Sequence, residues 1–133
     1  MTTTNEVKRT ERGWAGHFIL CDRCCFRRNT LIEYGDKKWV VSTVGNMRIK
    51  NGNYSYPMQQ IAHNTYYETM AFEADPESPY LDGDVTKEIT IESDWRLRAD
   101  SVEEFIKEHP LADNEADEMH ERIVKELMER IRD

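Results

Sequence analysis

The sequence lacks any long apolar run, and this absence excludes a membrane-spanning helix. No uninterrupted apolar segment in its 133 residues approaches the roughly 20 residues that a helix needs to cross a bilayer. The first residues also lack the basic and apolar regions of a secretory signal. We therefore expect a cytoplasmic protein that does not act at a membrane.

Cysteine is scarce, and its arrangement disfavours a disulfide scaffold. The chain has three cysteines, all between Cys21 and Cys25. An odd number with two adjacent members makes a poor disulfide framework, so we expect reduced thiols. Internal repeats, low-complexity tracts and interdomain linkers are absent as well. These absences predict a single domain over residues 11–133, behind a flexible N-terminus at residues 1–10.

The first half of the chain has few acidic residues, and the second half has few basic residues. The formal net charge is −8. Residues 1–50 contain ten Lys and Arg against five Asp and Glu, whereas residues 51–133 contain eight against twenty-one. The acidic half disfavours binding to long nucleic acid, whose phosphates it repels. Two interpretations stay open: one face meets acidic or phosphorylated partners, or the two halves neutralise each other within the fold.

Alternating and β-branched residues predict an antiparallel sheet built from consecutive hairpins over about residues 13–92. We expect its strands at 13–20, 26–34, 37–44, 66–72 and 85–91. A loop at 57–64, which contains His63, and an acidic loop at 73–79 separate the later strands.

Two dipeptides predict the turns of the first two hairpins. Gly35-Asp36 has the glycine-first pattern of a type II′ turn, and Asn51-Gly52 has the pattern of a type I′ turn. The second hairpin is expected to pair Ile49 with Tyr54 and Met47 with Tyr56.

The hydrophobic period then changes and predicts two C-terminal helices, at about 102–108 and 115–132. Ser101 and Glu104 have the spacing of a capping box, and Asn114 is expected to cap the second helix. An apolar stripe at helical spacing follows that helix: Ala116, Met119, Ile123, Leu127 and Ile131. The predicted fold class is α+β, an antiparallel sheet followed by two helices.

The segment Gly13–Asn29 concentrates chemically reactive side chains. Three potential zinc ligands lie in it, His17, Cys21 and Cys24, and a fourth, His63, lies downstream. A structural zinc site usually has two close ligand pairs, and the second pair is missing here. We therefore expect no bound metal, and we prefer buried thiols that pack as small apolar groups.

A small enzyme with a cysteine nucleophile is a second alternative. Arginines flank Cys24 and its neighbour Cys25, and positive charge stabilises a thiolate. The candidate catalytic residues are His17, Asp22, Cys24 and His63, with a histidine as base and Asp22, or alternatively Asn29, as the orienting group. Because no enzyme signature surrounds them, the sequence favours a non-enzymatic protein without a cofactor.

Basic and aromatic residues are interspersed across the predicted hairpins, a pattern that suits a phosphorylated nucleotide. Arginine forks match phosphate oxygens, and aromatic faces stack on bases. The candidate ligand-binding residues are Trp14, His17, Arg23, Arg27, Arg28, Asn29, Trp39 and Tyr66. Lys37, Lys38, Arg48 and Lys50 extend the basic set. The competing interpretation pairs the arginines with the acidic helices and places the aromatics in the core.

The acidic segment 101–133 has two interpretations of its own. Its apolar stripe covers the sheet, or its carboxylates dock in the basic groove of a partner protein. The candidate partner-binding residues are Glu115, Glu118, Glu121 and Glu129. The sequence leaves the oligomeric state open.

Four stretches carry a resemblance to known proteins: Arg12–Phe18, Asp22–Leu31, Val40–Gly45 and Tyr66–Phe72. Together they resemble a group of small proteins from bacteriophages and gut bacteria, over roughly residues 11–95. The group has no assigned activity, so the resemblance implies no catalytic residues. Its shared cysteine falls at Cys24, and Cys21 is particular to this chain, which weakens the zinc interpretation further.

The resemblance implies a phage or mobile-element context. In that context we expect a small intracellular, non-enzymatic binding protein that occupies or inhibits a host or defence component. The expected partner is a protein with a basic surface. The alternatives are sequestration of a phosphorylated nucleotide, and the cysteine and histidine enzyme or zinc site.

Overall fold

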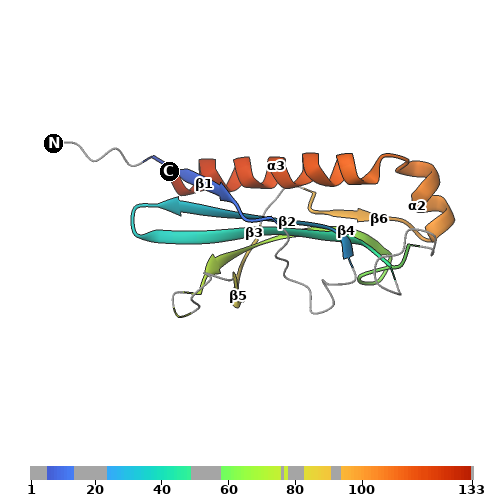
Figure 1. Cartoon of the computed structure of the whole chain (residues 1–133), viewed down its shortest axis with the longest axis horizontal. Coiled ribbons are helices and arrows are strands. Elements are labelled where there is room, and N and C mark those ends of the chain that lie inside the picture. The colour runs from blue at the N-terminus through green and yellow to red at the C-terminus, as the bar shows by residue number, and fades with distance from the viewer. Residues whose placement is uncertain are drawn as a thin grey trace.

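The computed structural model describes residues 6–13, 24–48, 58–75, 77, 83–90 and 94–132. In this part of the chain a six-stranded antiparallel sheet carries one long helix across a face (Figure 1). The elements are β1 (Lys8–Glu11), β2 (Cys24–Tyr34), β3 (Lys37–Met47), β4 (Thr65–Ala74), β5 (Gly83–Ile89), β6 (Arg96–Arg98), α2 (Val102–Glu108) and α3 (Ala112–Arg132). The predicted α+β class, with helices after the sheet, is confirmed.

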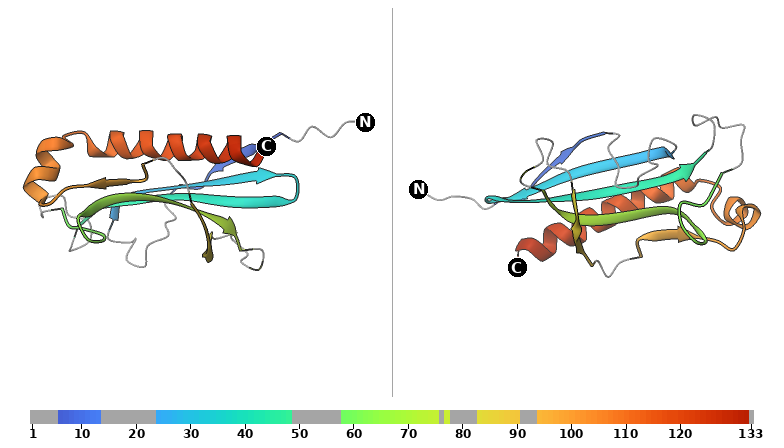
Figure 2. Two further views of the ribbon diagram at one scale, coloured as in Figure 1. Left: turned by 180° about the vertical axis from the view of Figure 1, so that it is seen from behind. Right: turned by 90° about the horizontal axis from the view of Figure 1, so that it is seen from below.

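The strands follow one another across the sheet in chain order from β1 to β5, and every pair is antiparallel. β6 departs from this order because it pairs with the first half of β4, whereas β5 pairs with the second half. Both therefore lie along the same side of β4. In the right-hand view of Figure 2, α3 lies behind the sheet and runs along its length.

The β2–β3 hairpin is the longest local feature, and its predicted turn is confirmed. Tyr34 faces Lys37 across a two-residue connection. Gly35 has a φ of +65°, which is the first-position requirement of a type II′ turn and is easily met by glycine. Both strands extend beyond the predicted bounds and contain eleven residues each.

The main core lies between the sheet and α3. Ile32, Val41 and Ala71 come from three neighbouring strands and are fully or almost fully buried. They belong to one apolar cluster with the stripe of α3: Ala116, Met119, Ile123, Val124 and Leu127. Burial of such side chains is the dominant favourable term in folding, so the predicted stripe is what holds α3 on the sheet.

The helix starts agree with the sequence at α2 and differ at α3. Ser101 caps α2, and its side chain accepts a hydrogen bond from the Glu104 N–H at 3.2 Å. Asn114, expected as the cap of the second helix, instead lies inside the first turn of α3. The reason is that the Leu111 carbonyl already accepts the Glu115 N–H at 3.1 Å, which closes the first helical turn earlier.

The N-terminal strand β1 was not expected. Residues 1–10 were predicted to be flexible, whereas Lys8–Glu11 pairs with Glu33–Thr30 of β2. No apolar alternation marks this strand. Its alternate residues Arg9 and Glu11 make ion pairs with Arg28 and with α3, and only the tertiary structure brings these charges together.

The second predicted hairpin is corrected at Met47. Met47 faces Cys24 on one side and bridges to Gln59 on the other, where the sequence predicted Tyr56. Its turn, Asn51-Gly52, and the pair Ile49 and Tyr54 lie outside the described residues.

The first predicted strand, 13–20, also lies outside the described residues except for Gly13, which has a φ of +70° in a turn. No helix among the described residues is long and apolar enough to cross a membrane.

Candidate functional site

A groove opens at the corner where α2 turns into α3, and we call it the corner groove. Its floor is formed by Tyr67 and Phe105, both almost completely buried. Its rim carries Ile106 and Leu111, and Arg48, which follows the end of β3, also lines it. The groove therefore joins residues from the sheet, from α2 and from the turn before α3.

The aromatic floor is tightly packed. Tyr66 and Tyr67 lie against the Phe105 ring, with centroids at 4.5 Å and 5.8 Å. His109 packs on the same ring at 4.7 Å. Gly45 makes room for this arrangement, because a Cβ there would lie 2.3 Å from Cδ2 of Tyr67. A glycine inside a strand often marks such a close approach.

Hydrogen bonds fix the walls of the groove. The Tyr67 hydroxyl donates to Oδ1 of Asp113 at 2.6 Å. Burial, and then this bond to Asp113, raise the pKa of Tyr67 well above its usual value, so the phenol stays a donor. His109 Nδ1 lies 2.9 Å from Oε1 of Glu115, and Arg48 Nε donates to Oδ1 of Asn46 at 2.9 Å. The floor and walls are thus held in place by the protein itself.

The rim is apolar, exposed and surrounded by negative charge. Ile106 is 56% exposed and Leu111 is 65% exposed, and they are the two large apolar residues in the described part of the chain that face solvent to this degree. Residues 101–121 contain eight carboxylates and one cation, Lys107. Residues 122–132 contain two carboxylates and four cations. The acidity of the helical segment is therefore concentrated in α2 and the first half of α3, which meet at the corner groove, and the charged residues that line the groove itself are Asp113 and Arg48.

A second polar cluster lies under α3, with one histidine and three threonines fully buried between the helix and the sheet and one carboxylate at its exposed end. His120 Nε2 is 2.7 Å from the Thr30 hydroxyl, and His120 Nδ1 is 2.6 Å from the Thr43 hydroxyl. The Thr43 and Thr69 hydroxyls are 2.5 Å apart. Thr30 also donates to Oε2 of Glu11 at 2.5 Å. We call these five residues the hydroxyl–histidine chain.

The carboxylate end sets the direction of every bond in this chain. Burial raises the pKa of Glu11, but hydrogen bonds from Thr30, Arg9 and Arg28 outweigh it and lower that pKa to about 2. An ionised carboxylate only accepts, so Thr30 gives it its single proton and must accept from His120 Nε2–H. Burial, and then the charge of Arg28, lower the pKa of His120 to about 3, so the ring is neutral.

With its proton on Nε2, the His120 ring accepts at Nδ1. Thr43 must then be the donor to Nδ1, and Thr43 must itself accept from Thr69. All five groups are satisfied in one direction, which is the condition for a polar cluster to be tolerated in a core. The arrangement gives the chain a structural role: it fixes α3 laterally on the sheet.

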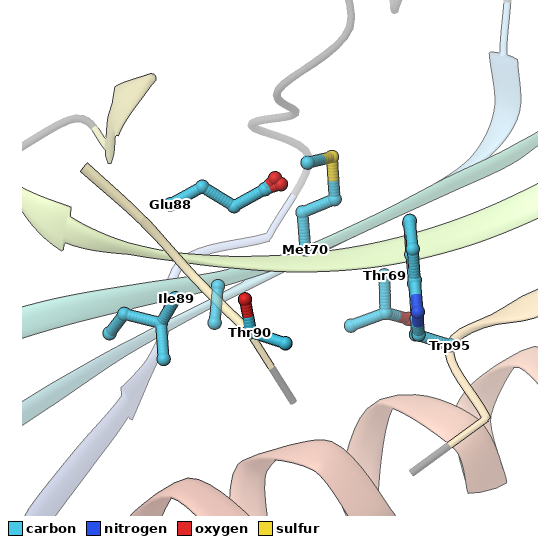
Figure 3. A pocket seen from close by; sticks show the side chains of 7 residues that line it. Thr69, Met70, Glu88, Ile89, Thr90 and Trp95 are labelled. Carbon is cyan, nitrogen blue, oxygen red and sulfur yellow. The ribbon is translucent and has the colours of Figure 1, made fainter. Parts of the chain in front are cut away.

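Figure 3 shows a small hollow at the Thr69 end of this chain. Trp95 stands beside Thr69 on one side, and Ile89 and Thr90 from the end of β5 lie on the other. The Trp95 carbonyl accepts the Thr69 N–H at 2.8 Å, which holds the backbone preceding β6 against β4. The hollow marks where β5 leaves β4 and β6 takes its place.

Ion pairs at the Glu11 end of the hydroxyl–histidine chain join the two oppositely charged halves of the sequence. Glu121 on α3 binds Arg9 at 2.8 Å and Arg28 at 2.6 Å. Arg28 also binds Glu11 at 2.6 Å. The neutralisation interpretation therefore holds for Arg9 and Arg28.

The candidate metal and catalytic residues are only partly described. Cys24 is buried with Val44 and Ile61, the environment of a thiol that packs as an apolar group. His63 is exposed in the turn before β4. His17, Cys21 and Asp22 lie outside the described residues. Among the residues that the structure does describe, no three His, Cys, Asp or Glu side chains gather in a potential metal site.

The candidate ligand-binding residues are distributed over different parts of the fold. Arg28 is held in ion pairs under α3, and Tyr66 is buried against the Phe105 ring. Asn29 is buried and accepts from Arg12 Nε at 2.8 Å. Trp39 is partly buried against the main core. Arg27 is also partly buried in β2.

Three members of the wider basic set lie at opposite ends of β3. Lys37 and Lys38 begin the strand, and Arg48 follows its end. Trp14, Arg23 and Lys50 lie outside the described residues.

The four candidate partner-binding glutamates also differ in position. Glu121 is engaged by two arginines, and Glu115 by His109. Glu118 and Glu129 are exposed, but Glu129 belongs to the cation-rich half of α3 and lies more than two helical turns beyond Glu118.

Sequence reasoning missed Ile106, Leu111 and His120 as site residues. Ile106 lies in α2 and Leu111 directly follows Pro110, so both lie outside the apolar stripe of α3. Apolar residues outside such a stripe are expected to be exposed. His120 lies next to the stripe residue Met119, yet nothing in the sequence shows that two threonines from neighbouring strands, Thr30 and Thr43, meet it.

Comparisons with known proteins give no match: no protein-family model, no curated protein sequence and no solved structure is similar to this chain.

Proposed function

We propose that the chain is a non-enzymatic binding protein that docks on a partner protein through the corner groove. The observation that carries the proposal is the exposure of Ile106 and Leu111 above a fixed aromatic floor. Exposed apolar side chains gathered at one groove mark interaction surfaces. The partner inserts an apolar side chain into the groove and surrounds it with basic residues.

Charge determines which partners the groove accepts. The carboxylates around the corner attract a basic surface and repel an acidic one, which gives both selectivity and a faster encounter. A preformed floor also lowers the entropy that binding costs. The resemblance to phage proteins makes a host or defence component the expected partner class, which the bound protein occupies and blocks.

The first experiment locates the contact. A photo-crosslinking amino acid is placed at Leu111, and a matched control carries it at Lys125, which is exposed on α3 outside the groove. Both proteins are irradiated in extract of the natural host, and adducts are identified by mass spectrometry. A basic protein captured from position 111 and not from position 125 supports the proposal.

The second experiment measures the affinity of that partner. Replacing Ile106 and Leu111 with Ser is expected to weaken binding by at least about tenfold, as the loss of central apolar contacts does. Lys125→Ser is expected to bind as the parent does. Binding by the parent should weaken as NaCl rises from about 50 to about 500 mM. Full-strength binding by the folded double variant would show that the groove is not the docking site.

A further inference from the structure

A second hollow lies at the other end of the molecule, beyond the last pairing of β3 with β4. β3 pairs with β4 from Gly45 back to Trp39, which faces Glu73. The β2–β3 hairpin then continues past the end of β4 (Figures 1 and 2). Among the described strands, β2 is the one that pairs with the next two residues, Lys37 and Lys38. The hollow beside them also receives Lys87 from β5, and we call it the hairpin hollow.

Two of the lysines at the hairpin hollow make no ion pair among the described residues. Lys37 and Lys87 are exposed, and neither makes an ion pair within the described part of the chain. Lys38 approaches Glu33 only to 3.9 Å. In contrast, the closest arginine–carboxylate contacts under α3 are 2.6 Å. In a protein with a net charge of −8, these lysines are available for an external anion.

An aromatic ring lies beside these lysines. Trp39 lines the hairpin hollow and is partly buried against the main core. It also faces Ile131 of α3 across an adjoining depression, so the ring is anchored between sheet and helix. A fixed indole offers a stacking face for a flat ring, and lysine binds phosphate as a point charge.

Size and net charge limit the class of ligand. The hairpin hollow has a volume of about 540 Å³, within the range of about 300–1,000 Å³ that is typical of small-molecule sites. Two carboxylates, Asp36 and Glu73, share its lining with the three lysines. Lys38 also pairs with Glu33, so the local charge is close to balanced, which suits one phosphate group better than a polyphosphate.

We infer that the hairpin hollow binds a small molecule that carries one phosphate and a flat aromatic ring, the chemistry of a nucleoside monophosphate. The phosphate lies between Lys37 and Lys87, and the ring stacks on Trp39, whereas Lys38 follows Lys37 in β3 and pairs with Glu33. This site is separate from the corner groove, so it acts independently of the proposed docking function. It differs from the surface expected from the sequence because Lys87 joins it and Arg28 does not.

The test uses the full chain and AMP, with adenosine and inorganic phosphate as the two part-ligands. Calorimetric titration is expected to show saturable AMP binding, at least about tenfold tighter than either part-ligand alone, because the two contacts reinforce each other. Lys37→Gln and Lys87→Gln should each weaken AMP binding by about threefold or more. Lys125→Gln, a matched control on α3, should leave the affinity unchanged.

Two further measurements keep the result decisive. Thermal unfolding of each variant shows that it is folded, and amide chemical shifts in the AMP titration should move around the β2–β3 turn and Lys87. The Ile106 and Leu111 double Ser variant should bind AMP like the parent, which separates this site from the docking proposal. Absence of saturable AMP binding at millimolar concentration, or an equal loss with Lys125→Gln, overturns the inference.

Discussion

At the scale of single residues, Gly45 determines how closely the groove floor packs on the sheet. A Cβ at this position would lie 2.3 Å from Cδ2 of Tyr67 and 2.8 Å from the Tyr66 carbonyl oxygen. The Tyr67 ring has little freedom to move away, because it stacks on Phe105 and its hydroxyl binds Asp113. The glycine is therefore required by its neighbour and not by a special backbone conformation.

Gly45→Ala is expected to destabilise the protein by about 1–3 kcal/mol, the usual cost of forcing an extra carbon into a packed interior. Urea denaturation measures this change. In a Tyr67→Ala background the cost should fall but not vanish, since the contact with the Tyr66 carbonyl oxygen at 2.8 Å remains. An equal cost in both backgrounds would show that the Tyr67 ring is not what excludes the side chain.

At the scale of elements, α3 is attached to the sheet by three kinds of contact. The apolar stripe supplies most of the stabilisation, and the hydroxyl–histidine chain fixes the lateral position. The ion pairs of Glu121 with Arg9 and Arg28 connect α3 to β1 and β2. These charges are partly exposed, so each pair contributes little by itself. Their value is that they bring the edge strand β1 under the helix.

The ion pairs predict different effects for two glutamates on neighbouring turns of α3. Glu121→Lys is expected to lower the free energy of unfolding by about 1–2 kcal/mol, because it loses two pairs and places a third cation beside Arg9 and Arg28. Glu118→Lys should change it by no more than about 0.5 kcal/mol, since that residue is exposed. Thermal or urea unfolding of both variants measures the difference, and equal effects would contradict the attachment role. Glu118 is therefore the better position for testing partner binding by charge reversal.

At the scale of the whole molecule, three lowered pKa values make the fold sensitive to acid. The pKa of Glu121 falls to about 2, chiefly through its hydrogen bond from Arg9, and that of Glu11 also falls to about 2. The two carboxylates stabilise the fold at pH values above 4.5, which is their ordinary pKa. They lose that contribution as the pH drops toward 2. His120 acts earlier: its pKa is lowered from 6.5 to about 3, so the unfolded chain takes up a proton first.

Between pH 6.5 and 5, His120 accounts for most of the loss of stability among the three groups with a lowered pKa. The free energy of unfolding is expected to fall there with a slope approaching about 1.4 kcal/mol per pH unit, the value for one proton bound only by the unfolded state. His120→Gln should remove most of this slope, whatever its effect on stability at pH 7. His63→Gln serves as the control. Urea denaturation at several pH values measures the slope, and its persistence in His120→Gln would contradict the assignment.

The sequence by itself determined the elements that depend on local chemistry. Gly35-Asp36 specifies a two-residue turn because glycine accepts positive φ, and Ser101 specifies the start of α2 because its side chain satisfies a free N–H. The stripe of α3 follows from helical periodicity alone. The α+β class follows from these elements in order.

Only the tertiary structure decided where polar and charged residues meet. The β1 strand and the hydroxyl–histidine chain depend on contacts between residues up to 112 positions apart, which no local pattern encodes. The same holds for the two proposed sites. Ile106 and Leu111 become a rim only because Tyr67 and Phe105 form a floor beneath them, and Lys87 joins the hairpin lysines only because β5 follows β4 in the sheet. Local propensity acts between neighbours in sequence, whereas a site is made by neighbours in space.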